Sequence, residues 1–143
     1  MIEILLDTNI ILDIALKRTP FFNKSSELFK IIEEKKIIAY ITATTITDIY
    51  YISRKEKDHK TAIEFIKNLI QQVDVVGVDK EIILDSLNSK LKDFEDAIQE
   101  KAAKHNNVNI IITRNKNDFK DSDLTIYTPK EFINHLPNIK DMV

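Results

Sequence analysis

Short apolar runs alternate with longer amphipathic segments along the whole chain. The runs are rich in isoleucine and valine and occupy residues 2–6, 37–41, 73–78, 108–113 and 124–127. Runs of this kind predict β-strands, whereas the segments between them repeat apolar residues every three or four positions, as amphipathic helices do. Strands that alternate with helices form βαβ units, so the pattern predicts a mostly parallel sheet with helices on both faces.

The predicted helices fill the intervals between these strands. They cover residues 8–17, 21–36, 42–55, 59–72, 80–91, 93–105 and 129–136. Pro20 closes the first helix, and Pro129 stands in the first turn of the last one. Near-continuous apolar strands are typical of sheets that are covered on both faces. We therefore expect one α/β domain that comprises residues 1–143.

Composition narrows the possible chemistry. A chain of 143 residues with 43% apolar and 31% charged residues is typical of one soluble domain with its own core. The absence of cysteine excludes a disulfide framework, a thiol nucleophile and cysteine-ligated zinc. His59, His105 and His135 are far apart and lack the spacing of a zinc hydrolase.

Charge and hydropathy limit the expected partners and location. The formal net charge of −2 gives no overall attraction for a polyanion, so a nucleic-acid partner needs a local basic patch or bound metal ions. No apolar run approaches the roughly 20 residues of a membrane span. Glu3 and Asp7 interrupt the apolar N-terminal stretch, and no basic segment precedes it. We therefore expect no signal peptide and a cytoplasmic protein.

Acidic and polar residues follow several of the predicted strands. Asp7 ends the first strand, Thr113 and Asn115 follow the fourth, and Asp48 comes a few residues after the second. In open parallel sheets the functional crevice lies beyond the carboxyl ends of the strands. We therefore expect the chemistry of this chain to gather at that edge.

Asp7 and Asp48 each have a simpler interpretation when taken alone. Asp7 fits the N-cap of the following helix, where its carboxylate would accept a backbone N–H. Asp48 follows Thr45 in the T-x-x-D pattern of a capping box. Against the second interpretation, Asp48 directly precedes the apolar run IYYI, and a carboxylate in apolar surroundings is costly without partners.

The acids of DFED and TRNKNDF are ambiguous in the same way. Asp93 and Asp96 fit the N-cap and third position of one helix, with Glu95 as a solvated charge. Asp118 fits a turn residue. Taken together with Asp7, however, acids that converge on one edge repel each other and raise each other's pKa unless a divalent cation neutralises them.

The residue types of this site favour one class of metal and one class of reaction. A site of Asp, Asn and Thr without His or Cys suits Mg²⁺ or Mn²⁺ better than zinc. Such ions polarise phosphates and activate water, so an acid-only site favours phosphodiester hydrolysis. Glycoside hydrolysis also uses two carboxylates, but it needs no metal and usually an aromatic cleft, and this chain has no tryptophan.

Four stretches in order resemble the PIN-domain ribonucleases, which include the bacterial VapC-type toxins of toxin–antitoxin pairs. They are LLDTNIILD, TATTITDIYYI, DFEDAIQEKAAKH and IIITRNKNDF, and the closing YTPKEFI resembles the last strand and helix of the family. The resemblance covers essentially the whole chain. It implies a three-layer α/β/α domain with a five-stranded, mainly parallel sheet of order 3-2-1-4-5. It also implies a Mg²⁺- or Mn²⁺-dependent endoribonuclease, the toxin of a type II pair, with RNA as substrate, a cognate antitoxin and a homodimer as expected partners.

The resemblance assigns expected roles to the acids. Asp7 and Asp96 resemble the direct metal ligands, and Asp48 takes the place of an acid that is glutamate in many members. The shorter side chain of Asp48 is expected to bind the metal through water. Asn9 is expected to orient Asp7 or a bound water, and Asp93 is an alternative to Asp96.

The resemblance extends to the segment after the fourth strand. Many relatives carry an acid where this chain has Asn115, so Asn115 is expected as a neutral ligand while Asp118 supplies the charge. Thr113 would be a hydroxyl donor near the scissile phosphate. A basic rim is expected to hold the RNA backbone by phosphate contacts, unless these residues are scattered solubilising charge. The rim comprises Arg54, Lys55, Arg114, Lys116 and Lys120.

Functions of other classes remain open. A PIN domain without catalysis would act only as an RNA- or protein-binding module, and the departures at Asp48 and Asn115 favour this alternative. A Mg²⁺-binding phospho-acceptor domain of flavodoxin-like topology would use Asp79 after the third strand, but it also requires an acid pair in the first loop and a lysine after the fifth strand, which this chain lacks. A haloacid-dehalogenase-type phosphatase requires aspartate where Asn9 stands.

Overall fold

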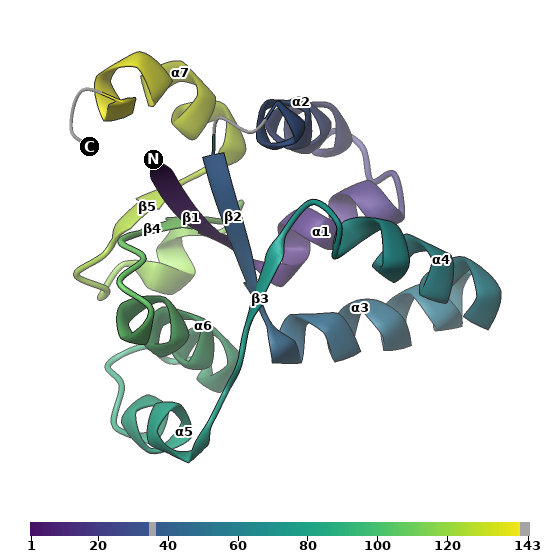
Figure 1. Ribbon diagram of the computed structural model, residues 1–143. Helices are drawn as coiled ribbons and strands as arrows, with labels where there is room; N and C mark the ends of the chain where they lie inside the picture. Colours follow the sequence, from purple (N-terminus) through teal and green to yellow (C-terminus); the bar gives the residue numbers. More distant parts are fainter. Residues whose placement is uncertain (35–36, 141–143) are drawn as a thin grey trace.

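Five parallel strands form the centre of the molecule (Figure 1). The computed structural model describes residues 1–34 and 37–140. The strands are β1 (Ile2–Leu6), β2 (Ile37–Thr42), β3 (Asp74–Val76), β4 (Ile110–Ile112) and β5 (Thr125–Tyr127). Their order in the sheet is β3-β2-β1-β4-β5, and every neighbouring pair is parallel. The predicted fold class and strand order are confirmed, and the order differs from the 2-1-3-4-5 of flavodoxin-like domains.

Helices connect the strands as the apolar periodicity predicts. They are α1 (Thr8–Ala15), α2 (Phe22–Glu33), α3 (Ala43–Glu56), α4 (His59–Leu69), α5 (Lys80–Leu87), α6 (Phe94–His105) and α7 (Pro129–Lys140). Residues 35–36, at the end of the second predicted helix, lie outside the described residues. A short 3₁₀ helix, η1 (Lys116–Phe119), stands where a turn was expected. None of the described helices is long and apolar enough to cross a membrane.

Three of the strands, β3, β4 and β5, are shorter than the apolar runs that predicted them. The run 73–78 contributes only three residues to the sheet, because β3 pairs with β2 along Tyr40 to Thr42 alone. In the run 108–113, Val108 is buried in the core without belonging to β4. Apolar residues thus extend beyond the paired strand wherever the chain is still covered by helices.

The alternation of side chains along the strands divides the core into two layers. Ile4 and Leu6 of β1 pack with α1, α2, α3, α4 and α7 on one face. Leu5 points to the other face, where it packs with α5, α6 and Phe119 of η1. Figure 1 shows these two groups of helices on opposite sides of the sheet. Each fully buried Leu or Ile stabilises the fold by about 1.5–3 kcal/mol, so the central strand is fixed from both sides.

Candidate functional site

Asp7 lies at the carboxyl end of the central strand and is almost fully buried, with 6% of its surface exposed. Its Oδ2 accepts hydrogen bonds from the Thr113 hydroxyl at 2.7 Å and from Asn9 Nδ2 at 3.1 Å. Its Oδ1 accepts a hydrogen bond from Gln99 Nε2 at 3.0 Å. Asp7 occupies the N-cap position of α1 but makes no side-chain capping hydrogen bond. The predicted N-cap position of Asp7 is confirmed, and a backbone hydrogen bond from Thr8 lowers its pKa, but the carboxylate is held mainly by the three side chains.

The register of the sheet explains why Asp7 and Thr113 meet. Leu6 pairs with Ile112, and the backbone N–H of Asp7 donates to the Ile112 carbonyl at 2.9 Å. The next residue of each strand therefore emerges at the same edge of the sheet. Thr113 is fully buried, and its hydroxyl hydrogen is donated to Asp7. The strand order implied by the resemblance, with the fourth strand beside the first, thus brings these two residues together.

The electrostatics of Asp7 are dominated by its burial. Burial raises the pKa of Asp7 above its ordinary value, while the hydrogen bonds from Thr113 and Gln99 act in the opposite direction. The charge of Asp118 raises this pKa further. Neutral donors thus hold the Asp7 carboxylate, and no cation of the described residues pairs with it.

Asp93 and Asp96 begin α6 and have different surroundings. Asp93 is the N-cap, and its Oδ1 accepts the backbone N–H of Asp96 at 3.0 Å, so the predicted cap is confirmed. Asp96 is half-buried and faces the other acids. Burial, together with the charges of Asp7, Asp93 and Asp118, raises the pKa of Asp96 to about 7. The carboxylate of Asp96 therefore belongs to the acidic site, whereas that of Asp93 is engaged by the helix terminus.

Asp48 pairs with an acid that the sequence pattern presented as a solvated charge. The N-cap of α3 is Thr42, which accepts the backbone N–H of Thr45, so the capping box of Thr45 and Asp48 is wrong. Asp48 lies in the second turn and forms a side-chain hydrogen bond with Glu95. This contact, partial burial and the charges of Asp48, Asp93 and Asp7 raise the pKa of Glu95 to about 8. Glu95 is exposed, as the sequence pattern predicts, but its raised pKa indicates that it holds a proton which it donates to Asp48.

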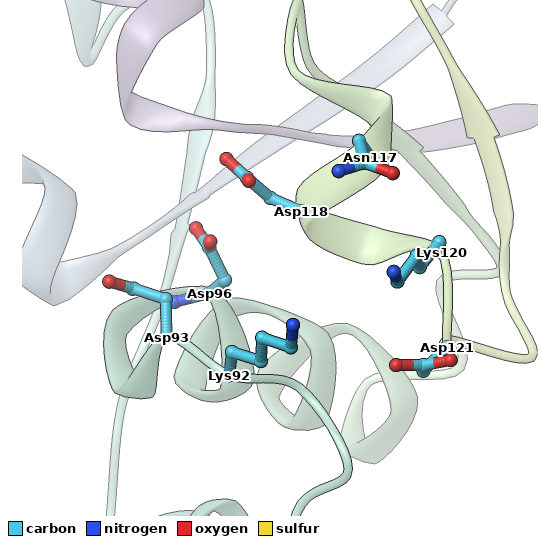
Figure 2. Close-up of a pocket in the computed structure, with 7 residues that line it drawn as sticks. All are labelled: Lys92, Asp93, Asp96, Asn117, Asp118, Lys120 and Asp121. Carbon is cyan, nitrogen blue, oxygen red and sulfur yellow. The ribbon is translucent and has the colours of Figure 1, made fainter.

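Asp118 meets Asp96 across a narrow pocket between α6 and η1. Figure 2 shows the Asp96 side chain rising from α6 toward the Asp118 carboxylate, whereas Asn117 lies farther from both. The pocket has a volume of about 90 Å³. Asp118 belongs to η1 rather than to a plain turn, and the buried Phe119 fixes this short helix against the core. Its charge contributes to the raised pKa of both Asp7 and Asp96.

The residues between Thr113 and Asp118 leave the strand and return to the site. The backbone N–H of Asn115 donates to the Thr113 hydroxyl oxygen at 3.1 Å. The Asn115 side chain is exposed, as is the Asp118 side chain. The structure therefore places Asn115 at the edge of the acidic group through its backbone contact with Thr113.

The expected basic rim divides into residues of different kinds. Arg114 Nε forms an ion pair at 3.0 Å with Asp13 Oδ2, and Asp13 is fully buried in α1. The Arg114 guanidinium also stacks 4.3 Å from the centre of the Phe21 ring. Lys116 pairs with Glu131 at 3.1 Å, and Arg54 is exposed in the last turn of α3. Arg114 thus links the segment after β4 to α1.

Known proteins resemble this chain in both sequence and fold. A family model described as PIN domain matches residues 3–117. The chain belongs to the PIN domain family. Ribonuclease VapC1 of Aquifex aeolicus (strain VF5) is 27% identical to this PIN domain over 135 residues. The matched residues cover 91% of this chain and 92% of the relative.

Solved structures share the fold of this PIN domain. DNA-bound VapBC from Salmonella typhimurium matches with a TM-score of 0.70 and 17% identity, over 90% of this chain and 99% of that one. VapC20 of Mycobacterium tuberculosis, described as a sarcin-ricin loop cleaving toxin, matches with a TM-score of 0.68 and 11% identity, over 85% of this chain and 96% of that one. At these identities the likeness concerns the fold alone.

The donor set of this PIN domain fits a hard divalent cation. Its side chains offer carboxylate and amide oxygens, which Mg²⁺ and Mn²⁺ prefer. Asn9 Oδ1 and Gln99 Oε1 are buried beside Asp7 and accept no hydrogen bond within the described part of the chain. No three His, Asp or Glu side chains of residues 1–34 and 37–140 are already close enough together to hold a metal ion. In the described residues the acids thus lie at one edge of the sheet, with Asp48 and Glu95 paired, but no three of them are close enough to bind one metal ion together.

Proposed function

We propose that this PIN domain is a Mg²⁺- or Mn²⁺-dependent endoribonuclease that acts in the cytoplasm as the toxin of a type II toxin–antitoxin pair. The family membership and the ribonuclease relative support the reaction class. The observation that carries the proposal is the convergence of acids from different elements at one sheet edge. The charges of Asp7 and Asp118 raise the pKa of Asp96, and the charge of Asp118 raises that of Asp7.

Carboxylates that lie close together lower the stability of the folded protein. Like charges that converge disfavour the folded state, and a divalent cation removes that repulsion. In this proposal Asp7 and Asp96 hold the cation directly, and Asp48 and Asp118 contribute through water. When bound, the ion would polarise a phosphodiester and activate a water molecule for hydrolysis.

The remaining residues of the site act on these carboxylates or on water. Thr113, Gln99 and Asn9 fix the orientation of the Asp7 carboxylate by three hydrogen bonds. Such partners behind a ligand typically contribute 10- to 100-fold to metal affinity or activity. The protonated Glu95 holds Asp48 in place. The exposed carboxamide of Asn115 is expected to contact either water or substrate at the rim.

Cleavage of RNA with defined metal content tests this proposal. A labelled RNA is incubated with the protein in Mg²⁺, in Mn²⁺ and in EDTA, and in parallel with the Asp7→Asn variant. We expect cleavage in either metal and none with EDTA or with Asp7→Asn. Equal cleavage in all four conditions would mean that a contaminant or another site is responsible.

The proposed partners rest on the relatives. Structural neighbours were solved as VapBC complexes, two of them bound to DNA. We infer a small antitoxin for this chain as well, and a homodimer in solution. Co-expression with the neighbouring reading frame, followed by size measurement by light scattering, tests both. Toxicity of the chain alone that the neighbour relieves is the expected result, and growth unaffected by the chain alone would contradict it.

One observation favours a second function, a PIN domain that binds RNA or protein without catalysis. No three acids of the described residues form a ready cage, and Asp48 is engaged with Glu95. Calorimetric titration with Mn²⁺ separates the two functions. Binding in the micromolar to low millimolar range that Asp7→Asn abolishes supports the nuclease, whereas no heat of binding supports the non-catalytic module.

A further inference from the structure

Two lysines enter the pocket between α6 and η1 beside the acids. Lys92 precedes α6 and Lys120 follows η1, and Figure 2 shows them on the side of the pocket away from the Asp96 and Asp118 carboxylates. The full lining comprises Lys92, Asp93, Asp96, Asn117, Asp118, Lys120 and Asp121. The pocket thus has an acidic part and a basic part.

Core packing anchors the chain beside each of the two lysines. Lys92 directly follows Leu91, and Lys120 directly follows Phe119. Leu91 and Phe119 are both buried in the same hydrophobic cluster, on the sheet face that α6 covers. The backbone of each lysine is therefore anchored by its neighbour, while both side chains are exposed to solvent.

Neither lysine is neutralised by the aspartates of its own pocket. Among the described residues, neither Lys92 nor Lys120 forms an ion pair. Other lysines of the chain do: Lys104 pairs with Asp123, and Lys116 pairs with Glu131. The ammonium groups of the pocket are therefore available to an anion from outside.

We propose that Lys92 and Lys120 form a phosphate subsite that holds a backbone phosphate of RNA next to the one at the acidic site. The inference rests on the proposed function and names two substrate-binding residues for it. Lysine binds phosphate as a compact point charge with rotatable donors. The volume of about 90 Å³ corresponds to roughly three water molecules. Ligand pockets for larger molecules span about 300–1,000 Å³, so this pocket takes a phosphate and not a nucleoside.

Two consequences distinguish this subsite from general attraction to the surface. Phosphate contacts fix the position of the chain but read no sequence, so the lysines act equally on RNAs of different sequence. The nearby Asp121 repels the phosphate, so its neutralisation in Asp121→Asn strengthens RNA binding.

The test is RNA binding as a function of salt. Fluorescence anisotropy of a labelled single-stranded RNA is measured in Mg²⁺ with the Asp7→Asn protein, which does not cleave it, and with Lys92→Gln or Lys120→Gln added. The matched control is Lys60→Gln, an exposed lysine of α4 on the other face of the sheet. Each pocket variant should bind roughly tenfold more weakly at low salt, as for loss of one charged hydrogen bond. The slope of log K against log salt should fall by about 0.7 for each lysine removed, and remain unchanged for Lys60→Gln.

Further measurements decide each outcome. Lys92→Arg and Lys120→Arg keep the charge and should keep the slope, which separates loss of charge from loss of folding. In the active protein the glutamine variants should raise KM with little change in kcat. RNA binding by the parent with slopes equal in all three glutamine variants overturns the subsite and leaves the nuclease standing. A wild-type protein that neither binds nor cleaves RNA overturns both.

Discussion

The two halves of the acidic edge hold their carboxylates in opposite ways. At the end of β1, the buried Asp7 is held by three neutral donors from Asn9, Gln99 and Thr113. Between α3 and α6, Asp48 is hydrogen-bonded to another acid, Glu95, whose pKa is raised to about 8. The hydrogen bonds orient the carboxylate of Asp7 before a ligand binds. The pair of Asp48 and Glu95, in contrast, must lose its proton before it carries two negative charges.

This difference follows from the elements that carry the residues. Asp7 and Thr113 end adjacent parallel strands, so the sheet register fixes their distance. Asp48 and Glu95 come from two helices that are joined to the sheet separately, and both side chains reach toward solvent. A strand end can therefore position a buried charge, while a helix pair positions its acids only through their mutual contact.

Asp7→Asn should separate activity from stability and is expected to have the largest effect. Loss of a direct metal ligand should reduce cleavage by more than about 100-fold, beyond the 10- to 100-fold typical of residues behind the ligands. Because burial raises the pKa of Asp7, its contribution to stability is present below its ordinary pKa of 3.8 and is lost as pH rises through the folded value. In EDTA at pH 8 the unfolding midpoint should therefore stay equal or rise. A large fall would mean that the charge of Asp7 supports the fold itself.

Arg114→Gln should destabilise the protein by about 3 kcal/mol, because it removes the ion pair of the fully buried Asp13 and leaves only the charge of Arg18 acting on it. The double variant Asp13→Asn/Arg114→Gln should recover most of this loss, since no buried charge then remains unpaired. Denaturant unfolding measures both. If Arg114 instead served mainly to bind RNA, the single variant would keep its stability and lose RNA affinity.

Gln99→Leu and Gln99→Glu should weaken Mn²⁺ binding by about tenfold or more, because both remove the amide that orients Asp7 Oδ1. Calorimetric titration measures the affinity, and far-ultraviolet circular dichroism confirms that the helix content is intact. The matched control is Gln72→Leu on the other side of the molecule, where the Gln72 side chain donates to Glu33. An unchanged affinity in Gln99→Leu would show that Asp7 needs no support from α6.

The sequence pattern was sufficient for the sheet and for the residues that the sheet positions. Apolar runs predicted all five strands, and the strand order implied by the resemblance to PIN domains places Asp7 beside Thr113. Periodicity did not predict η1, because its four residues are too few to show a repeat. Asp7 has the N-cap position that its sequence pattern predicts, but two of its donors, Gln99 and Thr113, come from other elements and no local spacing encodes those contacts.

The residues that support the acids could be found only partly from the sequence. Gln99 is fully buried on the apolar face of α6, and a buried polar side chain requires a partner, so its position was a usable signal. Glu95 gave no such signal, since an acid in the first turn of a helix is ordinary. The pairing of Asp13 with Arg114 depends on how α1 packs beside the segment after β4, and no local spacing encodes that contact.

Glu95→Gln should have the smallest effect on stability, and it tests whether Glu95 and Asp48 share a proton. Because the pKa of Glu95 is raised from its ordinary 4.5 to about 8, the pair with Asp48 contributes stability that is fully present below pH 4.5 and is lost as pH rises through 8. In EDTA the unfolding midpoint of the wild type should fall between pH 6 and pH 9 more than that of Glu95→Gln, in which the neutral amide still donates to Asp48 at every pH. Glu81→Gln, at an exposed acid in the first turn of α5, is the matched control and should follow the wild type. Parallel curves for Glu95→Gln and the wild type would show that the two carboxyls do not share a proton, and the contrast between the two halves of the edge would then rest on burial alone.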